Sequence, residues 1–94
     1  MSIETIKNKI SPILKKYPIS EAFLFGSVAR GEQRPDSDVD VLVKFTRMGG
    51  LFEFVGIKLE LQEALDGKPV HLVQDEAVRK EFRSSIEKDK VRIF

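Results

Sequence analysis

Hydrophobic residues recur at helical spacing in the first part of the chain, where isoleucine or leucine stands at positions 3, 6, 10, 13 and 14. This spacing places them on one face of a helix, and Ser2 is suited to cap its first turn. Pro12 has no backbone N–H, so the helix is expected to kink there, or to give way to a short second helix capped by Ser11. In either case the helical segment is predicted to end near Tyr17 and Pro18.

Two apolar runs follow with the length and composition of strands. The first covers residues 22–25 and stops at Gly26, and the second covers residues 39–45. Because side chains alternate along a strand, the valines at 39, 41 and 43 should share one face, and Asp38, Asp40, Leu42 and Lys44 the other. The connection between the two runs is short and must include a turn. An antiparallel pair is therefore at least as well supported as a parallel crossover.

The second half of the chain continues the alternation of helices and strands. Gly49 and Gly50 precede a helical pattern from Leu51 to Leu65, which Gly67 is suited to close in the left-handed conformation. Further elements are predicted as a strand over 69–73, a helix over 76–86 and a fourth strand over 91–94. This order predicts an α/β fold of the α+β kind, with a small mixed sheet of three or four strands flanked by helices.

The helical pattern over 51–65 is apolar around much of its circumference. Its large apolar residues include Phe52, Phe54, Val55, Leu59, Leu61 and Leu65. A stripe this broad is expected to be core, or core together with an interface, rather than a cofactor site.

Composition sets the scale and the surroundings. With 94 residues, of which 41% are apolar and 33% charged, residues 1–94 are expected to form a single globular domain. The net charge of +1 gives no overall field that would gather nucleic acid or an anionic membrane. The absence of cysteine excludes disulfides and thiolate metal sites, and no segment resembles a signal peptide or a membrane span. We therefore expect a cytoplasmic protein without membrane or nucleic-acid partners.

Two aspartates at the start of the second strand are the first candidates for chemistry. Asp38 and Asp40 are two residues apart, so their carboxylates point to the same side, where they repel and raise each other's pKa. A divalent cation between them removes this repulsion. Hard oxygen ligands suit Mg²⁺, or Mn²⁺, bound together with phosphate oxygens.

The end of the first strand supplies a second candidate. Gly26 lets the backbone approach a ligand closely, and free N–H groups in a helical turn over residues 27–30 would bind phosphate. Gly26 and Gly31 have the spacing of a P-loop, but Glu32 stands where its lysine must be. The three aspartates at 36, 38 and 40 mimic an EF-hand loop that lacks its glycine and glutamate. A merely polar turn around Asp38 stays open as an alternative.

Gly26-Ser27, ten intervening residues and then Asp38-Val39-Asp40 resemble the signature of the DNA polymerase beta nucleotidyltransferase superfamily. The run "FGSVARGE…SDVDVLV" is similar to its minimal nucleotidyltransferase (MNT) branch. The resemblance implies the nucleotidyltransferase fold, with Gly26 and Ser27 at the phosphates of a nucleotide triphosphate and with Asp38 and Asp40 as catalytic ligands of Mg²⁺. Arg30 would contact phosphate as well, or would brace the loop through Glu32 or Asp36.

One position departs from the family pattern. The family completes its site with a third carboxylate on the next strand, where this chain reads "VHLV" and places His71. A neutral imidazole can ligate a transition metal or take up a proton, so His71 is a tentative third metal ligand. It is equally well explained as a bystander on the strand.

The resemblance implies a function and leaves an alternative to it. In the MNT branch the enzyme binds Mg-ATP and transfers AMP to a hydroxyl of a partner, which is a HEPN-domain toxin neutralised by its antitoxin through AMPylation of a tyrosine. The alternative is a weakened nucleotidyltransferase module that neutralises its partner by binding, a reading that His71 favours. Transfer to a small molecule or nucleic acid is a third and weaker option, and self-association into a homo-oligomer stays open.

Overall fold

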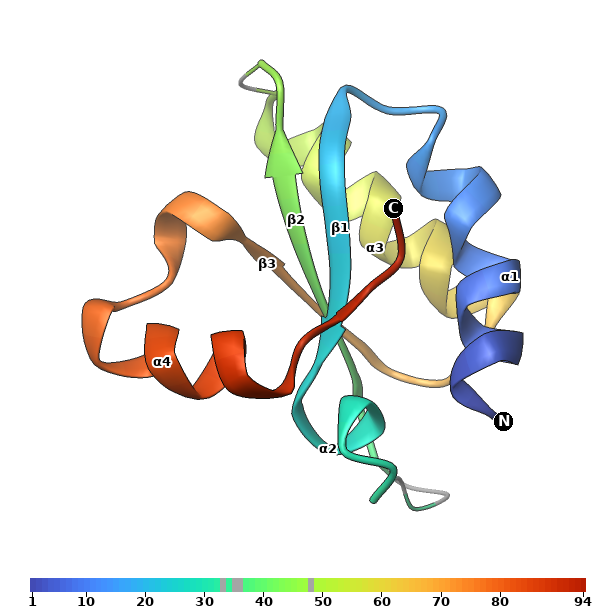
Figure 1. The fold of residues 1–94 in the computed structure, drawn as a ribbon. Coiled ribbons are helices and arrows are strands. Elements are labelled where there is room, and N and C mark those ends of the chain that lie inside the picture. The colour runs from blue at the N-terminus through green and yellow to red at the C-terminus, as the bar shows by residue number, and fades with distance from the viewer. Residues whose placement is uncertain (33, 35–36, 48) are drawn as a thin grey trace.

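A computed structural model describes residues 1–32, 34, 37–47 and 49–94 (Figure 1). The elements in chain order are α1 (Ile3–Leu14), β1 (Ile19–Phe25), α2 (Gly26–Ala29), β2 (Val39–Phe45), α3 (Leu51–Ala64), β3 (Val70–Gln74), the 3₁₀ turn η1 (Asp75–Ala77), α4 (Lys80–Asp89) and β4 (Val91–Arg92). The described strands form one sheet in the order β3-β2-β1-β4. Strand β1 is antiparallel to β2 and β4, whereas β2 and β3 are parallel. The predicted mixed sheet with flanking helices is confirmed.

Helix α1 begins as predicted and ends in a different way. The hydroxyl of Ser2 accepts a hydrogen bond of 3.1 Å from the N–H of Thr5, which caps the first turn. The prediction of a second helix capped by Ser11 is wrong, because α1 runs without interruption through Pro12. Pro12 lies in the last turn, where the N–H of Lys15 still reaches the carbonyl of Ser11 at 3.0 Å. Pro12 leaves the carbonyl of Asn8 without its helical donor, and because Asn8 is exposed, water can take the place of that donor.

The hydrophobic core lies between one face of the sheet and the pair α1 and α3. Val39, Val41 and Val43 are fully buried on that face, as the alternation in β2 predicts. The two helices contribute Ile6, Ile10, Leu14, Ile57 and Leu61, all of them fully buried. At the surface, Glu60 of α3 accepts hydrogen bonds from two residues that follow α1, Lys16, at 2.7 Å, and the hydroxyl of Tyr17, and these bonds link the two helices. Asp40 and Lys44 alternate with the valines and point to the opposite face.

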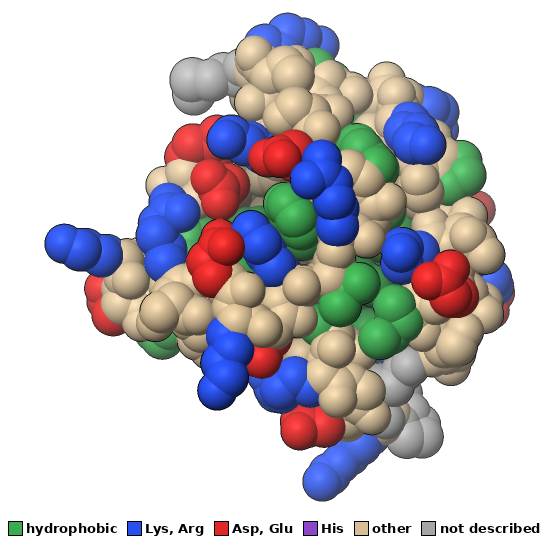
Figure 2. Space-filling model, viewed as in Figure 1, with side chains coloured by type: hydrophobic (Ala, Val, Ile, Leu, Met, Phe, Trp, Pro, Cys, Tyr) green, Lys and Arg blue, Asp and Glu red, His purple; other side chains and the backbone are tan. Residues whose placement is uncertain are grey.

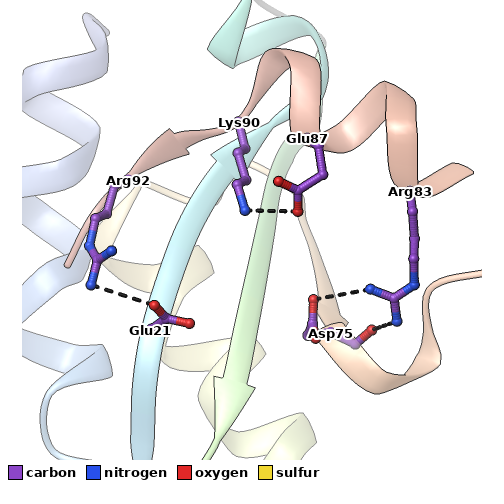
Figure 3. Close-up of polar contacts among 6 residues, drawn as sticks. All are labelled: Glu21, Asp75, Arg83, Glu87, Lys90 and Arg92. Atoms are coloured by element: carbon purple, nitrogen blue, oxygen red, sulfur yellow. Dashed lines mark hydrogen bonds and ion pairs between the residues drawn. The ribbon is translucent and has the colours of Figure 1, made fainter.

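The opposite face of the sheet is covered only in part, by η1 and α4 (Figure 1). No residue of α4 is fully buried, and polar contacts hold the helix and the C-terminal strand in place (Figure 3). Arg83 donates to the carbonyl of Asp75 at 3.0 Å, Lys90 pairs with Glu87, and Arg92 lies 3.6 Å from a carboxylate oxygen of Glu21. On the face drawn in Figure 2, acidic and basic side chains are interspersed, in keeping with the net charge of +1.

Several element boundaries differ from the sequence prediction. Strand β1 begins at Ile19 rather than at residue 22, because its first residues pair with the end of β2 near Phe45. The last helix begins at Lys80 rather than at residue 76, since the preceding residues form the 3₁₀ turn η1 and an extended link. Gly67 has the predicted left-handed φ, 84°, but Asp66, which directly follows the C-cap Leu65, is also left-handed, with a φ of 59°. Within the described residues no helix combines the length and the apolar character that a membrane span requires.

Candidate active site

Three neighbouring strands bring Phe25, Asp40 and His71 into line across the sheet. Phe25 is the register partner of Asp40 on β1, and His71 is its register partner on β3. Side chains of such partners lie on the same face of a sheet. This face is the one turned away from α1 and α3. Asp40 is therefore placed between Phe25 at the end of β1 and His71 near the start of β3.

Gly26 is in direct contact with the Asp40 carboxylate. Its φ is 71°, in the left-handed region that favours glycine. A Cβ atom at this position would overlap Oδ2 of Asp40. Glycine thus lets the chain turn from β1 straight into α2 without displacing the Asp40 side chain, and the turn brings the backbone of the predicted phosphate loop against one oxygen of the carboxylate.

The second oxygen of Asp40 faces His71. Oδ1 lies 3.2 Å from Nδ1 of the imidazole. The side chain of Asp40 is only 21% exposed, whereas that of His71 is 62% exposed. Burial raises the pKa of Asp40, and the charge of Asp38 raises it further. The hydrogen bond and charge of His71, together with the charge of Arg30, lower the pKa and offset part of this rise. The predicted rise in pKa is present for this aspartate, but desolvation is its main cause and the neighbouring Asp38 contributes less.

Asp38 occupies a more open position than Asp40. It is exposed and directly precedes β2. Its charge acts on Asp40, so the two carboxylates address the same region, as a divalent cation shared with phosphate oxygens would require. Over the described part of the chain, no three His, Asp or Glu side chains are gathered closely enough to hold a metal ion by themselves. The two carboxylates are hard oxygen donors, which fit Mg²⁺ or Mn²⁺ with phosphate oxygens completing the coordination.

Arg30 is held by two carboxylates. Its Nε donates to Glu32 at 3.0 Å, and its terminal nitrogen donates to Asp89 of α4 at 3.1 Å. These hydrogen bonds raise the pKa of the guanidinium group. The structure thus contains the bracing contact with Glu32 that the sequence offered as one role of Arg30, while its alternative partner Asp36 lies outside the described residues. A direct contact of Arg30 with phosphate stays a prediction.

A cavity of about 420 Å³ opens beside Asp40, between the sheet and α4. Gly26, Arg30 and His71 line it together with Arg79, Ser85 and Asp89 of the C-terminal part. Its apolar part is lined by Phe25, Val73, Val78, Phe82 and Ile86. The structure therefore brings three of the predicted site residues to one cavity. Ser27 faces a different hollow, which it shares with Glu32, Arg34 and Ser37.

Three residues around this site carried no predicted role in it. Phe25 was assigned only to an apolar strand, yet its ring centroid lies 6.5 Å from that of His71. Asp89 and Phe82 come from α4. Their participation depends on how α4 docks on the sheet, and no local pattern in the sequence encodes that docking.

The fold and the paired aspartates define a nucleotidyltransferase domain. Residues 8–94 match the family described as "Polymerase beta, Nucleotidyltransferase", and the chain belongs to this family. The resemblance found in the sequence is thereby confirmed.

Individual relatives place the chain in the minimal branch. It is 47% identical over 73 residues to MJ0435 of Methanocaldococcus jannaschii, a candidate protein adenylyltransferase, a match that covers 78% of this chain and 77% of the relative. It is 33% identical over 79 residues to "Protein adenylyltransferase MntA" of Thermococcus cleftensis, covering 84% of this chain and 79% of the relative.

Solved structures share the fold. A candidate minimal nucleotidyltransferase superposes with a TM-score of 0.82 at 31% identity, covering 97% of this chain and 95% of that structure. A chain of a toxin-antitoxin structure with AMP-PNP also gives 0.82, at 23% identity, covering 94% of this chain and 72% of its own length.

Proposed function

We propose that the protein is an adenylyltransferase that binds ATP with Mg²⁺, or with Mn²⁺, and transfers AMP to a hydroxyl group of a partner protein. The observation that carries this proposal is the position of Asp40, which has one carboxylate oxygen against the Gly26 turn and the other beside His71. The family membership and the names of the relatives support the same reaction.

The nucleotide is held by the turn that follows β1. The close approach of Gly26 to Asp40 leaves the backbone of Gly26 and Ser27 next to the metal-binding carboxylate, so phosphate and cation are bound at adjacent points. Asp38 and Asp40 would hold the cation, and His71 would serve either as its third ligand or as the base that receives the acceptor's proton. When bound, the cation would neutralise phosphate charge and stabilise the charge that develops on the leaving group. Arg30 adds a positively charged guanidinium group, whose orientation is fixed by its hydrogen bonds to Glu32 and Asp89.

The transfer step exchanges one bond at phosphorus for another. The acceptor hydroxyl oxygen forms a bond with the α-phosphorus of ATP, and the bond from that phosphorus to pyrophosphate breaks. Where His71 does not ligate the cation, its Nδ1–H donates to Asp40 and its Nε2 is free to take the proton of the hydroxyl. Asp40 then fixes the orientation of the imidazole, and it would also ligate the cation. Pyrophosphate leaves, and the partner carries AMP.

The proposed partner is a HEPN-type toxin, which makes this protein its antitoxin. One relative bears the name MntA. Structures with the same fold include the toxin-antitoxin pair MntA-HepT, at 19% identity, and a tri-AMPylated HEPN toxin of Shewanella oneidensis in complex with an MNT antitoxin, also at 19% identity. Because such low identity carries only the fold, the partner assignment rests on this analogy. A protein acceptor in the cytoplasm, where ATP is available, also agrees with the net charge of +1, which offers nucleic acid no overall attraction.

Mass spectrometry of the intact partner tests this function. After incubation with the protein, ATP and Mg²⁺, the toxin should gain the mass of one or more AMP groups, and the Asp38→Asn/Asp40→Asn double variant should add none. A toxin whose mass stays unchanged with the active protein would contradict the proposed reaction.

One specific feature favours a second function. His71 stands where the family pattern has a third carboxylate. A module so weakened would neutralise the toxin by binding alone. It would form a tight complex with the toxin, remove its toxic activity and leave its mass unchanged.

A further inference from the structure

Helix α3 is apolar on two opposite faces. Ile57 and Leu61 point into the core and are fully buried. Phe52, Val55 and Leu59 follow the same helical spacing on the outer side and are 93%, 42% and 57% exposed. Leu51, at the start of the helix, is 74% exposed. A continuous apolar row of this kind on a surface helix is typical of an interaction site, and we refer to Leu51, Phe52, Val55 and Leu59 as the outer stripe.

Gly56 lies beside this outer stripe, and no packing contact within the described residues requires a glycine at this position. Glycine in the middle of a helix destabilises it relative to alanine. A Cβ atom at position 56 would meet no atom of the described residues within 4 Å, so neither the core nor α1 requires the smaller residue. A glycine next to an exposed apolar row allows another helix to approach closely.

We propose that the outer stripe is a self-association surface, on which the α3 helices of two copies of this chain pack antiparallel around a two-fold axis near Val55 and Gly56. This inference does not depend on the proposed enzymatic function. In such an isologous contact, the same surface of both copies is used, so that if one residue contacts a second residue of the other copy, the second contacts the first in return.

The outer stripe is complementary to itself in this arrangement. With the axis between residues 55 and 56, Phe52 lies opposite Leu59 of the second copy, and Val55 lies over Gly56 of the second copy. An aromatic ring therefore meets an aliphatic side chain twice, and the glycine admits the bulkier neighbour at the centre. Both matches follow from residue positions alone, since antiparallel helices pair a residue toward one end with a residue toward the other.

Charge follows the same symmetry. Glu63 lies one turn beyond Leu59, and its side chain has no ion-pair partner among residues 1–32, 34, 37–47 and 49–94. The antiparallel pair places Glu63 near the start of α3 on the second copy. That end has a glycine as its N-cap, which provides no side-chain hydrogen bond, and carries Arg47, which is 63% exposed and lies 3.7 Å from Glu53 of its own chain. A carboxylate is stabilised at such a position by the helix dipole and by the arginine.

The contact also leaves the candidate active site accessible. Helix α3 packs on the face of the sheet that carries Val41 and Val43, whereas Asp40 and His71 lie on the other face. Two copies joined through α3 therefore turn their active sites away from each other. An acceptor protein can reach both sites of the dimer.

Sedimentation analysis of the full chain tests the proposal. The wild type should show a concentration-dependent dimer, and Phe52→Ser and Leu59→Ser should each weaken it by about tenfold or more, as expected for central interface residues. The matched control is Phe82→Ser, which removes a phenylalanine that is 55% exposed on α4 and should leave the dimer unchanged. Circular dichroism of each variant confirms that its fold is kept.

Cross-linking locates the axis independently. Because the chain contains no cysteine, Val55→Cys introduces a single thiol near the proposed axis, and Lys88→Cys introduces one on α4 as a control. Under mild oxidation Val55→Cys should form disulfide-linked dimers much faster than Lys88→Cys. A wild type that stays monomeric at every concentration, a dimer that survives both serine substitutions, or equal cross-linking of the two thiols would overturn the proposal. The proposal would also be overturned if the protein were a monomer and the stripe variants lost only their binding to the toxin, because the stripe would then be the toxin-binding surface.

Discussion

The Asp40 carboxylate lies so close to Gly26 that a Cβ atom at position 26 would overlap one of its oxygens. The contact joins the two parts of the sequence signature, the Gly-Ser turn and the paired aspartates, across the antiparallel strands β1 and β2. The other oxygen of the same carboxylate faces His71. Asp40 therefore contacts both the predicted phosphate turn, at Gly26, and His71, the residue that departs from the family pattern.

Substitution of Gly26 should damage both the fold and the site. Gly26→Ala forces a side chain into the left-handed region and against Asp40, and we expect it to lower the free energy of unfolding by about 2–3 kcal/mol. Gly31→Ala is the matched control, because Gly31 has a φ of 73° but its Cβ would meet no atom of the described residues within 4 Å. It should cost only about 1 kcal/mol. Urea denaturation measures both, and equal losses would show that the contact with Asp40 is unimportant.

The raised pKa of Asp40 predicts how stability depends on pH. Burial disfavours the charged form in the folded state, so the folded protein binds a proton that the unfolded chain has already released. The contribution of this group to stability is full below the ordinary aspartate pKa of about 3.9 and is lost as pH rises through the raised value. Asp40→Asn should thus stabilise the fold at neutral pH, by about 0.5–1 kcal/mol after solvent screening, and flatten this part of the pH profile.

Asp38 provides the control for this experiment. It is exposed, so Asp38→Asn should change the free energy of unfolding by less than about 0.5 kcal/mol. Chemical denaturation between acidic and neutral pH distinguishes the two variants. A destabilised Asp40→Asn at neutral pH would indicate that its hydrogen bond with His71 outweighs the cost of burial.

Binding of Mg-ATP should stabilise the wild-type protein. A ligand at about one hundred times its dissociation constant adds roughly 2.7 kcal/mol, which a thermal melt resolves easily. The Asp38→Asn/Asp40→Asn double variant should fold but show no shift with Mg-ATP. An equal shift in both proteins would place the nucleotide elsewhere.

His71 should set the preference for the metal ion. An imidazole nitrogen beside Asp40 is a poorer ligand for Mg²⁺ than a carboxylate, and a relatively better one for Mn²⁺. We expect transfer to be faster with Mn²⁺, His71→Asp to increase transfer with Mg²⁺, and His71→Ala to decrease transfer with either metal. Steady-state rates with each metal measure this. If neither substitution alters the rates or the metal preference, His71 is a bystander and Asp38 and Asp40 form the site alone.

Sequence reasoning was most successful where one local pattern determines the answer. The alternation in β2 predicts that Val39 and Val41 are buried and that Asp40 faces away from them, because a strand has no other arrangement of its side chains. The spacing of Gly26 and the aspartates predicts the family, which the family model confirms. The mixed sheet follows from the order of the elements.

Features that depend on docking between distant segments could not be predicted in this way. The first residues of β1 are partly polar, and they extend the strand only because they pair with β2. The ion pair of Arg30 with Asp89 exists only because α4 lies over the sheet. No residue of α4 is fully buried, so its sequence carries too weak a hydrophobic signal to fix where it begins or what it contacts.

The most direct test of the account uses two labelled forms of ATP. Mixed with the proposed toxin partner and Mg²⁺, the protein should transfer label from the α-phosphate of ATP to the partner, whereas label from the γ-phosphate should leave with pyrophosphate. The Asp38→Asn/Asp40→Asn double variant should transfer neither. Appearance of the γ-label on the partner would identify a kinase and contradict adenylyl transfer, and absence of both labels from a tightly bound partner would leave neutralisation by binding as the function.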